Sequence, residues 1–90
     1  MKGILIREVM GETLRELRGE AGMTLRQVST ASMVSLGYLS EIERGHKEAS
    51  SEVLASIAQA LGVPLSELLG MVTMKISARE MARRGIGIAA

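Results

Sequence analysis

Ninety residues with a formal net charge of +1 can form one small domain but not two separate cores, so all segments are expected to share one core. The chain is 47% hydrophobic, with one tyrosine and no phenylalanine or tryptophan, which leaves Leu, Ile, Val, Met and Ala to build that core and favours helices over sheets. The absence of cysteine and the single histidine exclude a disulfide framework and a cysteine-based zinc site, so we expect no metal and no cofactor.

No apolar run reaches the roughly 18 residues needed to span a membrane, and residues 1–6 are too short for the core of a signal peptide. We therefore expect a cytoplasmic protein. The nearly balanced charge gives no global basic field, so attraction to nucleic acid would have to come from a few clustered Lys and Arg side chains.

The first expected helix covers residues 9–21, where apolar side chains from Val9 to Leu17 recur at helical spacing and charged side chains occupy the remaining surface. Gly22 is expected to end it. The helix could begin as early as Leu5, because Ile6 continues the apolar stripe.

Two short helices are expected next. Thr24 and Gln27 form a capping box that would start a helix over residues 25–32, whose inward side is unusually polar. A tight turn at residues 33–34 leads to Ser35, which caps a helix over residues 36–44, and Gly45 stands where a left-handed residue commonly ends a helix.

The second half of the chain predicts further helices. An amphipathic pattern covers residues 51–61, and Pro64 sets the first turn of a fifth helix over residues 65–69. Beyond Gly70, an apolar stretch and a second capping box at residues 77–80 leave two alternatives, a sixth helix or an irregular extension. The residues alone therefore predict an all-α fold with five helices.

Two short helices joined by a tight turn over residues 24–45 form a helix-turn-helix pattern. The residues that carry it are Met23-Thr24-Leu25-Arg26-Gln27-Val28-Ser29, Val34-Ser35 and Tyr38-Leu39-Ser40-Glu41-Ile42-Glu43-Arg44-Gly45. This segment closely resembles the Xre family of Cro and phage-repressor transcription factors, and residues 50–69 look like its fourth and fifth helices. The resemblance implies a five-helix lambda-repressor-like DNA-binding domain over residues 5–70, followed by a C-terminal extension over residues 71–90.

The helix over residues 36–44 would enter the major groove of double-stranded DNA, where side chains meet base edges. By residue chemistry and by the family's base-reading positions, the expected base-reading residues are Leu36, Gly37, Ser40 and Glu41. Spacing alone is equally compatible with the solvated face of any small helical bundle, and the family resemblance favours base reading.

Phosphate contacts are expected from positive charges, hydroxyl groups and free N–H groups at helix starts near this helix. These residues are Arg26, Ser35, Tyr38, Arg44, His46, Lys47, Ser50 and Ser51. For each basic residue alone, an ordinary solubilising charge is an equal alternative. The resemblance also implies a structural ion pair between Arg18 and Glu43, which would fix the angle of the recognition helix.

Three residues depart from the family pattern. Leu25 stands where a phosphate-binding glutamine is common, Ser32 replaces a core leucine, and Met33 replaces a turn glycine. We expect Met33 to supply the apolar volume that Ser32 lacks.

Helix-turn-helix proteins usually pair two recognition helices on a near-palindromic operator, so we expect a homodimer. Apolar residues beyond the needs of one small core would form the interface: Leu65, Leu68, Leu69, Met71, Val72, Met74 and Ile76. The alternative is that they fold back on the monomer.

Within the family, these segments are similar to actinobacterial regulators of Clp protease genes. That similarity implies activation of Clp protease and stress genes, with RNA polymerase and Clp protease as partners. The end Ala89-Ala90 resembles the small apolar tags that Clp proteases read, and a frayed terminus without any signal is the favoured alternative. The alternative function is a helical protein-interaction module that does not bind DNA. We expect no enzyme and no catalytic residues, because there are no paired carboxylates at a cleft and no nucleophile stands beside a histidine motif.

Overall fold

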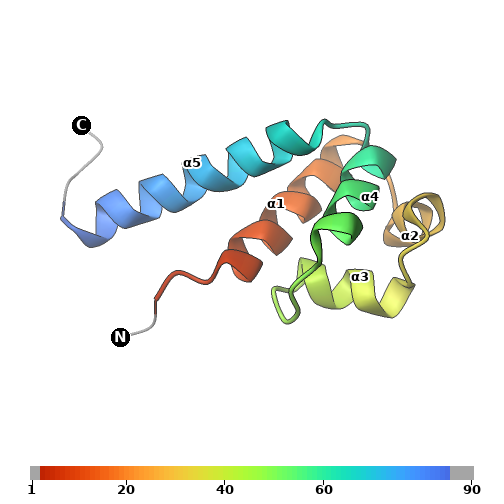
Figure 1. Cartoon of the computed structure of the whole chain (residues 1–90), viewed down its shortest axis with the longest axis horizontal. Helices are drawn as coiled ribbons and strands as arrows, with labels where there is room; N and C mark the ends of the chain where they lie inside the picture. The colour runs from red at the N-terminus through yellow and green to blue at the C-terminus, as the bar shows by residue number, and fades with distance from the viewer. Residues whose placement is uncertain (1–2, 86–90) are drawn as a thin grey trace.

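The computed structural model describes residues 3–85, which form five α-helices and no strand. The helices are α1 (Ile6–Glu20), α2 (Leu25–Ser32), α3 (Leu36–Glu43), α4 (Ser51–Leu61) and α5 (Leu65–Arg83). The expected all-α class is confirmed. Figure 1 shows the long helices α1 and α5 lying side by side, with the three shorter helices gathered at one end.

Local capping residues set the starts of α2, α3 and α4. The Gln27 N–H donates to Thr24 Oγ1 at 3.1 Å and the Thr24 N–H donates to Gln27 Oε1 at 2.8 Å, which completes the predicted capping box. Ser35 and Ser50 accept from the N–H groups three residues further on, at 3.3 and 3.2 Å. These bonds satisfy N–H groups that a helix start otherwise leaves free.

The core lies where all five helices meet. Its largest fully buried side chains are aliphatic: Leu14, Leu39, Ile42, Ile57 and Leu68, each with under 2% of its surface exposed. With no large aromatic ring among them, packing depends on close helix crossings. The tightest is at Gly11 of α1, where a Cβ atom would lie 2.3 Å from the Ile42 carbonyl oxygen of α3.

The C-terminal part corrects two expectations. The helix begun at Pro64 does not stop at Gly70, and no separate sixth helix forms within residues 3–85, because α5 runs unbroken from Leu65 to Arg83. Val72 is buried, and Met71 and Ile76 pack against the core, so tertiary contacts carry the helix past a residue of low helix propensity.

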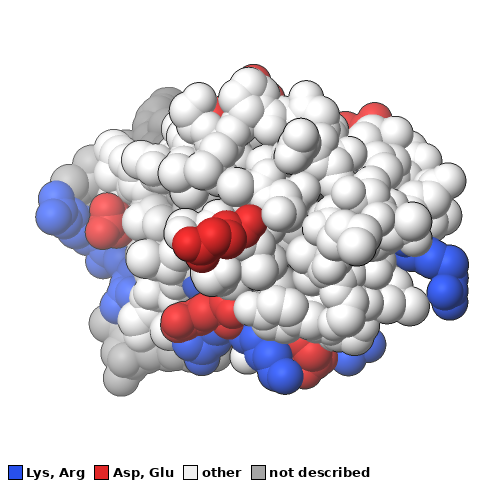
Figure 2. Space-filling model, turned by 45° about the vertical axis from the view of Figure 1, so that its right-hand side comes forward, with Lys and Arg blue, Asp and Glu red and all other residues white. Residues whose placement is uncertain are grey.

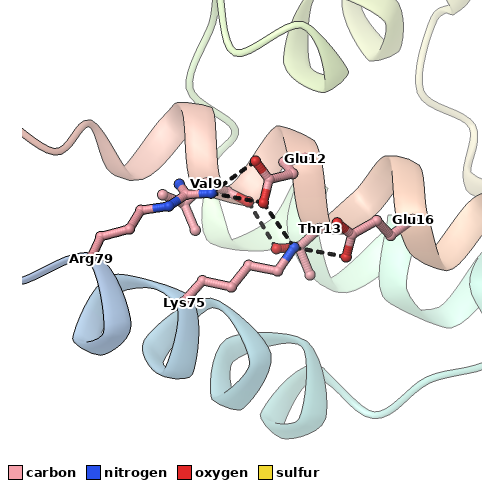
Figure 3. A network of polar contacts seen from close by, with 6 residues as sticks. All are labelled: Val9, Glu12, Thr13, Glu16, Lys75 and Arg79. Carbon is pink, nitrogen blue, oxygen red and sulfur yellow. Dashed lines mark hydrogen bonds and ion pairs between the residues drawn. The ribbon is translucent and has the colours of Figure 1, made fainter. Parts of the chain in front are cut away.

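Charged side chains hold the second half of α5 against α1 (Figure 3). Lys75 Nζ lies 3.1 Å from Glu12 Oε2 and 2.7 Å from Glu16 Oε1, and Arg79 Nη2 contacts both oxygens of Glu12 at 2.9 Å. Hydrogen bonds from Arg79 and Lys75 lower the pKa of Glu12. Burial by itself would lower the pKa of Lys75, but its hydrogen bonds to Glu16 and Glu12 together outweigh burial and raise that pKa.

The α2–α3 turn corrects the expectation for Met33. This side chain is 91% exposed and fills no core volume, and its backbone is left-handed at φ 63°. The polar group of Ser32 is accommodated instead: its hydroxyl accepts from the Val34 N–H at 3.3 Å and donates to the Ser29 carbonyl at 3.4 Å. The Ser29 hydroxyl donates to the Val34 carbonyl at 2.5 Å, so the turn is held by hydrogen bonds.

Candidate nucleic-acid interface

Helix α3 has one buried side and one outward side. Leu39 and Ile42 are 0% and 1% exposed and face the core. Because α1 crosses α3 at Gly11 with no room for a side chain, the distance between the two helices is fixed at this crossing. The position of the outward side of α3 relative to α1 is therefore fixed as well. The residues expected to read bases, Leu36, Gly37, Ser40 and Glu41, are all partly or fully exposed.

The predicted ion pair between Arg18 and Glu43 is present. Arg18 Nε lies 2.8 Å from Glu43 Oε2 and Nη2 lies 3.0 Å from Oε1, a two-pronged contact between α1 and the end of α3. Arg18 Nη1 also donates to the Met23 carbonyl at 3.1 Å. The hydrogen bonds that Arg18 donates to the Glu43 carboxylate raise the pKa of Arg18. With the Glu43 side chain only 8% exposed, this pair fixes the direction of α3.

Gly37 is the most open point of the outward side. A Cβ atom built there would have no neighbour within 4 Å, so the fold itself does not require glycine at this position. Glu41 is more constrained: its Oε2 lies 3.6 Å from Arg44 Nη1 and 3.4 Å from His46 Nδ1. A base edge that donates a hydrogen bond to Glu41 would therefore compete with Arg44 and His46 for the same carboxylate oxygen.

Most of the expected phosphate-binding residues lie around the start of α2 and the loop between α3 and α4. Arg44, His46 and Lys47 follow one another along the loop with exposed side chains, and Ser50 and Ser51 lie at the start of α4. Arg26 is exposed in the first turn of α2. The caps use the oxygens of Ser35 and Ser50 as acceptors, which leaves both hydroxyl hydrogens for a phosphate.

Tyr38 already has a partner in this structure. Its hydroxyl donates to the Glu48 carbonyl at 2.8 Å, so a phosphate would have to replace that carbonyl as the acceptor, and the phosphate contact stays a prediction. Arg7 Nη1 lies 3.6 Å from the Glu48 carboxylate oxygen Oε2. Sequence reasoning missed Glu48 altogether, since a backbone carbonyl carries no residue-type signal.

Charge is sparse on the face that α2, α3 and α4 turn outward. Figure 2 shows a broad area almost without charge across its upper half, acidic atoms near the middle, basic side chains at the left and right edges, and both signs along the lower edge, the level at which α3 lies in Figure 1. Both signs are mixed there. Any attraction to phosphates must come from a few local cations, as the net charge of +1 implied.

The predicted dimer interface also needs correction. Leu68 and Val72 are 0% and 4% exposed inside the monomer, so they are core residues with no surface to offer a partner. Leu65, Met71 and Ile76 are partly buried against the same core. Leu69 and Met74 are 43% and 73% exposed and remain candidates for an interface.

Two further expectations concern the ends of the chain and membranes. The signal expected at Ala89-Ala90 lies outside the described residues. None of the helices in residues 3–85 is by itself long and apolar enough to cross a membrane; α4 and α5 meet that test only as a pair, with a 104° bend between them.

The family model for helix-turn-helix proteins matches residues 14–68. The transcriptional regulator ClgR of Mycobacterium tuberculosis strain H37Rv is 60% identical over 65 residues, which cover 72% of this chain and 58% of that protein. This chain thus spans little more than half the length of that relative.

Solved structures extend the likeness. The crystal structure of the clp gene regulator ClgR from Corynebacterium glutamicum superposes with a TM-score of 0.83 at 42% identity, covering 92% of this chain and 88% of that one. The restriction-modification controller protein C.Esp1396I, solved as a tetramer on its natural 35 base-pair operator, has a TM-score of 0.75 at 23% identity, covering 82% of this chain and 97% of that one. At that identity the likeness is one of fold. From the matched segment and these relatives, the chain belongs to the Xre-like helix-turn-helix family, as the residues of α2 and α3 predicted.

Proposed function

We propose that this protein is a sequence-specific regulator of transcription that binds double-stranded DNA with α3 in the major groove. The observation that carries the proposal is the way α3 is held against the domain. Its inner side is buried, a two-pronged ion pair fixes its end, and its outward side carries small and hydrogen-bonding residues. A major groove admits one such helix, and Ser40 and Glu41 carry groups that can bond base edges. The controller protein C.Esp1396I, which shares the fold, was solved in complex with its operator, and this supports DNA binding by a protein of this fold.

Selection of bound sequences from random DNA, followed by affinity measurement at several salt concentrations, tests this proposal. Three permanent cations, Arg26, Arg44 and Lys47, lie near α3, so a dimer would neutralise about six phosphates. The logarithm of affinity should then fall with the logarithm of salt concentration with a slope of about −5. A helical protein-interaction module, the alternative function, would select no DNA and bind its partner with little dependence on salt.

We further propose that the protein acts as a homodimer through the exposed face of α5. Leu69 and Met74 lie five residues apart, about 140° round the helix, so they border the exposed face of α5 on its two sides and leave apolar surface exposed there. Cutting the chain at Gly70 would remove Val72 from the core, so point substitution is the cleaner test. Leu69→Asp and Met74→Asp should convert a dimer to a monomer in sedimentation, whereas Ala55→Asp on the exposed side of α4 should not. A monomeric wild-type protein would contradict this.

The likeness to ClgR supports a finer proposal, in which the protein activates Clp protease and stress genes through RNA polymerase. Purified protein should then bind DNA upstream of Clp protease genes more tightly than unrelated promoters, and should raise transcription from it. Clp protease would in turn degrade the regulator. An unchanged lifetime in cells after Ala89→Asp and Ala90→Asp would count against that last step.

A further inference from the structure

An apolar groove opens between the start of α1 and the loop that joins α3 to α4. It has a volume of about 420 Å³, within the range of small-molecule sites in proteins. Its aliphatic walls are formed by Ile4, Leu5, Ile6, Met10, Ile42 and Leu54. Ile6 stands at the mouth with 63% of its surface exposed.

The rim of the groove carries an excess of positive charge. Arg7, Lys47 and Glu48 line it, so two cations stand against one carboxylate. The contact between Arg7 Nη1 and Glu48 Oε2 is loose at 3.6 Å, with the Glu48 side chain 79% exposed. No ion pair or side-chain hydrogen bond engages the Lys47 ammonium among the described residues, and this group is therefore available to an incoming anion.

We propose that this groove binds an amphipathic carboxylate, a molecule with an aliphatic body and one anionic head. The body would replace water along Ile4, Leu5, Ile6 and Leu54, whereas Met10 and Ile42 are already buried and form the floor of the groove. The head would lie between Lys47 and Arg7. A neutral alcohol with the same body would lose the charged contact, and an aliphatic amine would meet repulsion from both cations.

The groove adjoins the residues proposed to hold DNA phosphates. Lys47 belongs to both sites, and Ala49 lines the groove just before the start of α4. The Tyr38 hydroxyl also ties α3 to the same loop through the Glu48 carbonyl at 2.8 Å. A carboxylate on Lys47 would compete with a phosphate for that ammonium. The ligand would thus lower DNA affinity, and DNA would lower ligand affinity by the same factor. This coupling rests on the proposed DNA-binding function; the binding itself does not.

The test titrates the full ¹⁵N-labelled chain, without DNA, with octanoate, decanoate and dodecanoate below their micelle-forming concentrations. Amide shifts should saturate and gather at Ile6, Ala49 and Leu54. Affinity should rise about two- to fourfold for each added methylene, the upper value corresponding to ~0.8 kcal/mol per buried CH₂. Decanol and decylamine should bind at least tenfold more weakly than decanoate.

Matched variants separate the groove from general surface binding. Arg7→Gln should weaken decanoate about three- to tenfold, whereas Arg15→Gln, on an exposed part of the same helix, should leave it unchanged. Ile6→Glu, which places a carboxylate at the exposed mouth, should abolish saturable binding while circular dichroism stays that of the wild type.

The proposal is overturned if decanoate does not saturate, if shifts gather on α5 instead, if decanol binds as well as decanoate, or if the two arginine variants behave alike. DNA affinity at saturating decanoate is then measured on the selected operator, with an expected loss of about tenfold. Saturable binding at the groove with unchanged DNA affinity would overturn the coupling alone. Failure of DNA selection with intact decanoate binding would count against the proposed function and leave the ligand site standing.

Discussion

Gly11 lies where α1 crosses α3, and its replacement by alanine tests whether the two helices pack as closely as the structure shows. The added Cβ would lie 2.3 Å from the Ile42 carbonyl oxygen and 2.7 Å from that of Glu43. Ordinary carbon–oxygen contacts are about 3.3 Å or longer, so α3 would have to move by about 1 Å. Both oxygens belong to the backbone of a helix, which cannot yield as the end of a side chain can.

The magnitude follows from two opposing effects. Overpacking of this kind costs up to about 3 kcal/mol, while alanine gains about 1 kcal/mol of helix propensity over glycine. We therefore expect Gly11→Ala to lower the free energy of unfolding by about 2 kcal/mol. Gly37→Ala is the matched control, because its Cβ meets nothing within 4 Å. It should raise the free energy of unfolding by about 0.5–1 kcal/mol.

Urea unfolding followed by circular dichroism measures both stabilities, and fluorescence anisotropy with the selected operator measures DNA affinity. The two variants should differ in which property they lose. Gly11→Ala should be less stable than the wild type. Gly37→Ala should be stable but bind DNA at least tenfold more weakly, because its methyl group would enter the major groove of the DNA. A Gly11→Ala protein as stable as the wild type would refute the close crossing. Full DNA affinity in Gly37→Ala would refute close approach of the α3 backbone to the bases.

Three further variants test separate parts of the structure. Glu43→Gln should lower the free energy of unfolding by about 2–3 kcal/mol, because Arg18 loses its carboxylate partner, and should weaken binding to all DNA sequences alike; a changed base preference would contradict its structural role. Met33→Gly should stabilise the fold by about 0.5–1 kcal/mol by relieving a left-handed backbone at an exposed site, and a loss in urea midpoint would count against that. The folded-state pKa of Glu12 is lowered from its ordinary value of 4.5, so its contribution to stability is present above that pH and lost as the pH falls through the folded value. The difference in unfolding free energy between wild type and Glu12→Gln should therefore shrink below about pH 4.5, and a constant difference would exclude this linkage.

Features encoded by neighbouring residues were predictable. The starts of α2, α3 and α4 depend on Thr24, Ser35 and Ser50, whose side chains bond N–H groups three residues away. The Arg18–Glu43 pair joins distant segments and came from family resemblance, which supplies what local patterns lack.

Features decided by tertiary contacts were not predictable from local patterns. Gly70 looks like a helix end, but packing of α5 on the core continues the helix through it. The family pattern at Ser32 predicts that Met33 enters the core, whereas Met33 is exposed and the Ser32 hydroxyl is hydrogen-bonded within the turn. The commitment of the Tyr38 hydroxyl depends on where the Glu48 carbonyl lies.

The charge pattern of the sequence also encodes the pairing of α1 with α5. Glu12 and Glu16 lie four residues apart on α1, and Lys75 and Arg79 lie four residues apart on α5. Each pair occupies one side of its helix, and the signs are opposite. The two pairs together predict that α1 pairs with α5 and that α5 extends beyond Gly70, and Figure 3 shows the contacts between their side chains.

The central claim is that α3 reads base edges, and the most direct measurement compares the DNA sequences selected by the wild type and by Glu41→Gln. A carboxylate accepts a hydrogen bond from cytosine, whereas a carboxamide both donates and accepts and suits adenine. The account predicts that the two selected sequences share their length and symmetry and differ at one symmetric pair of positions. Identical selected sequences, or no enrichment by the wild type at low salt, would contradict it.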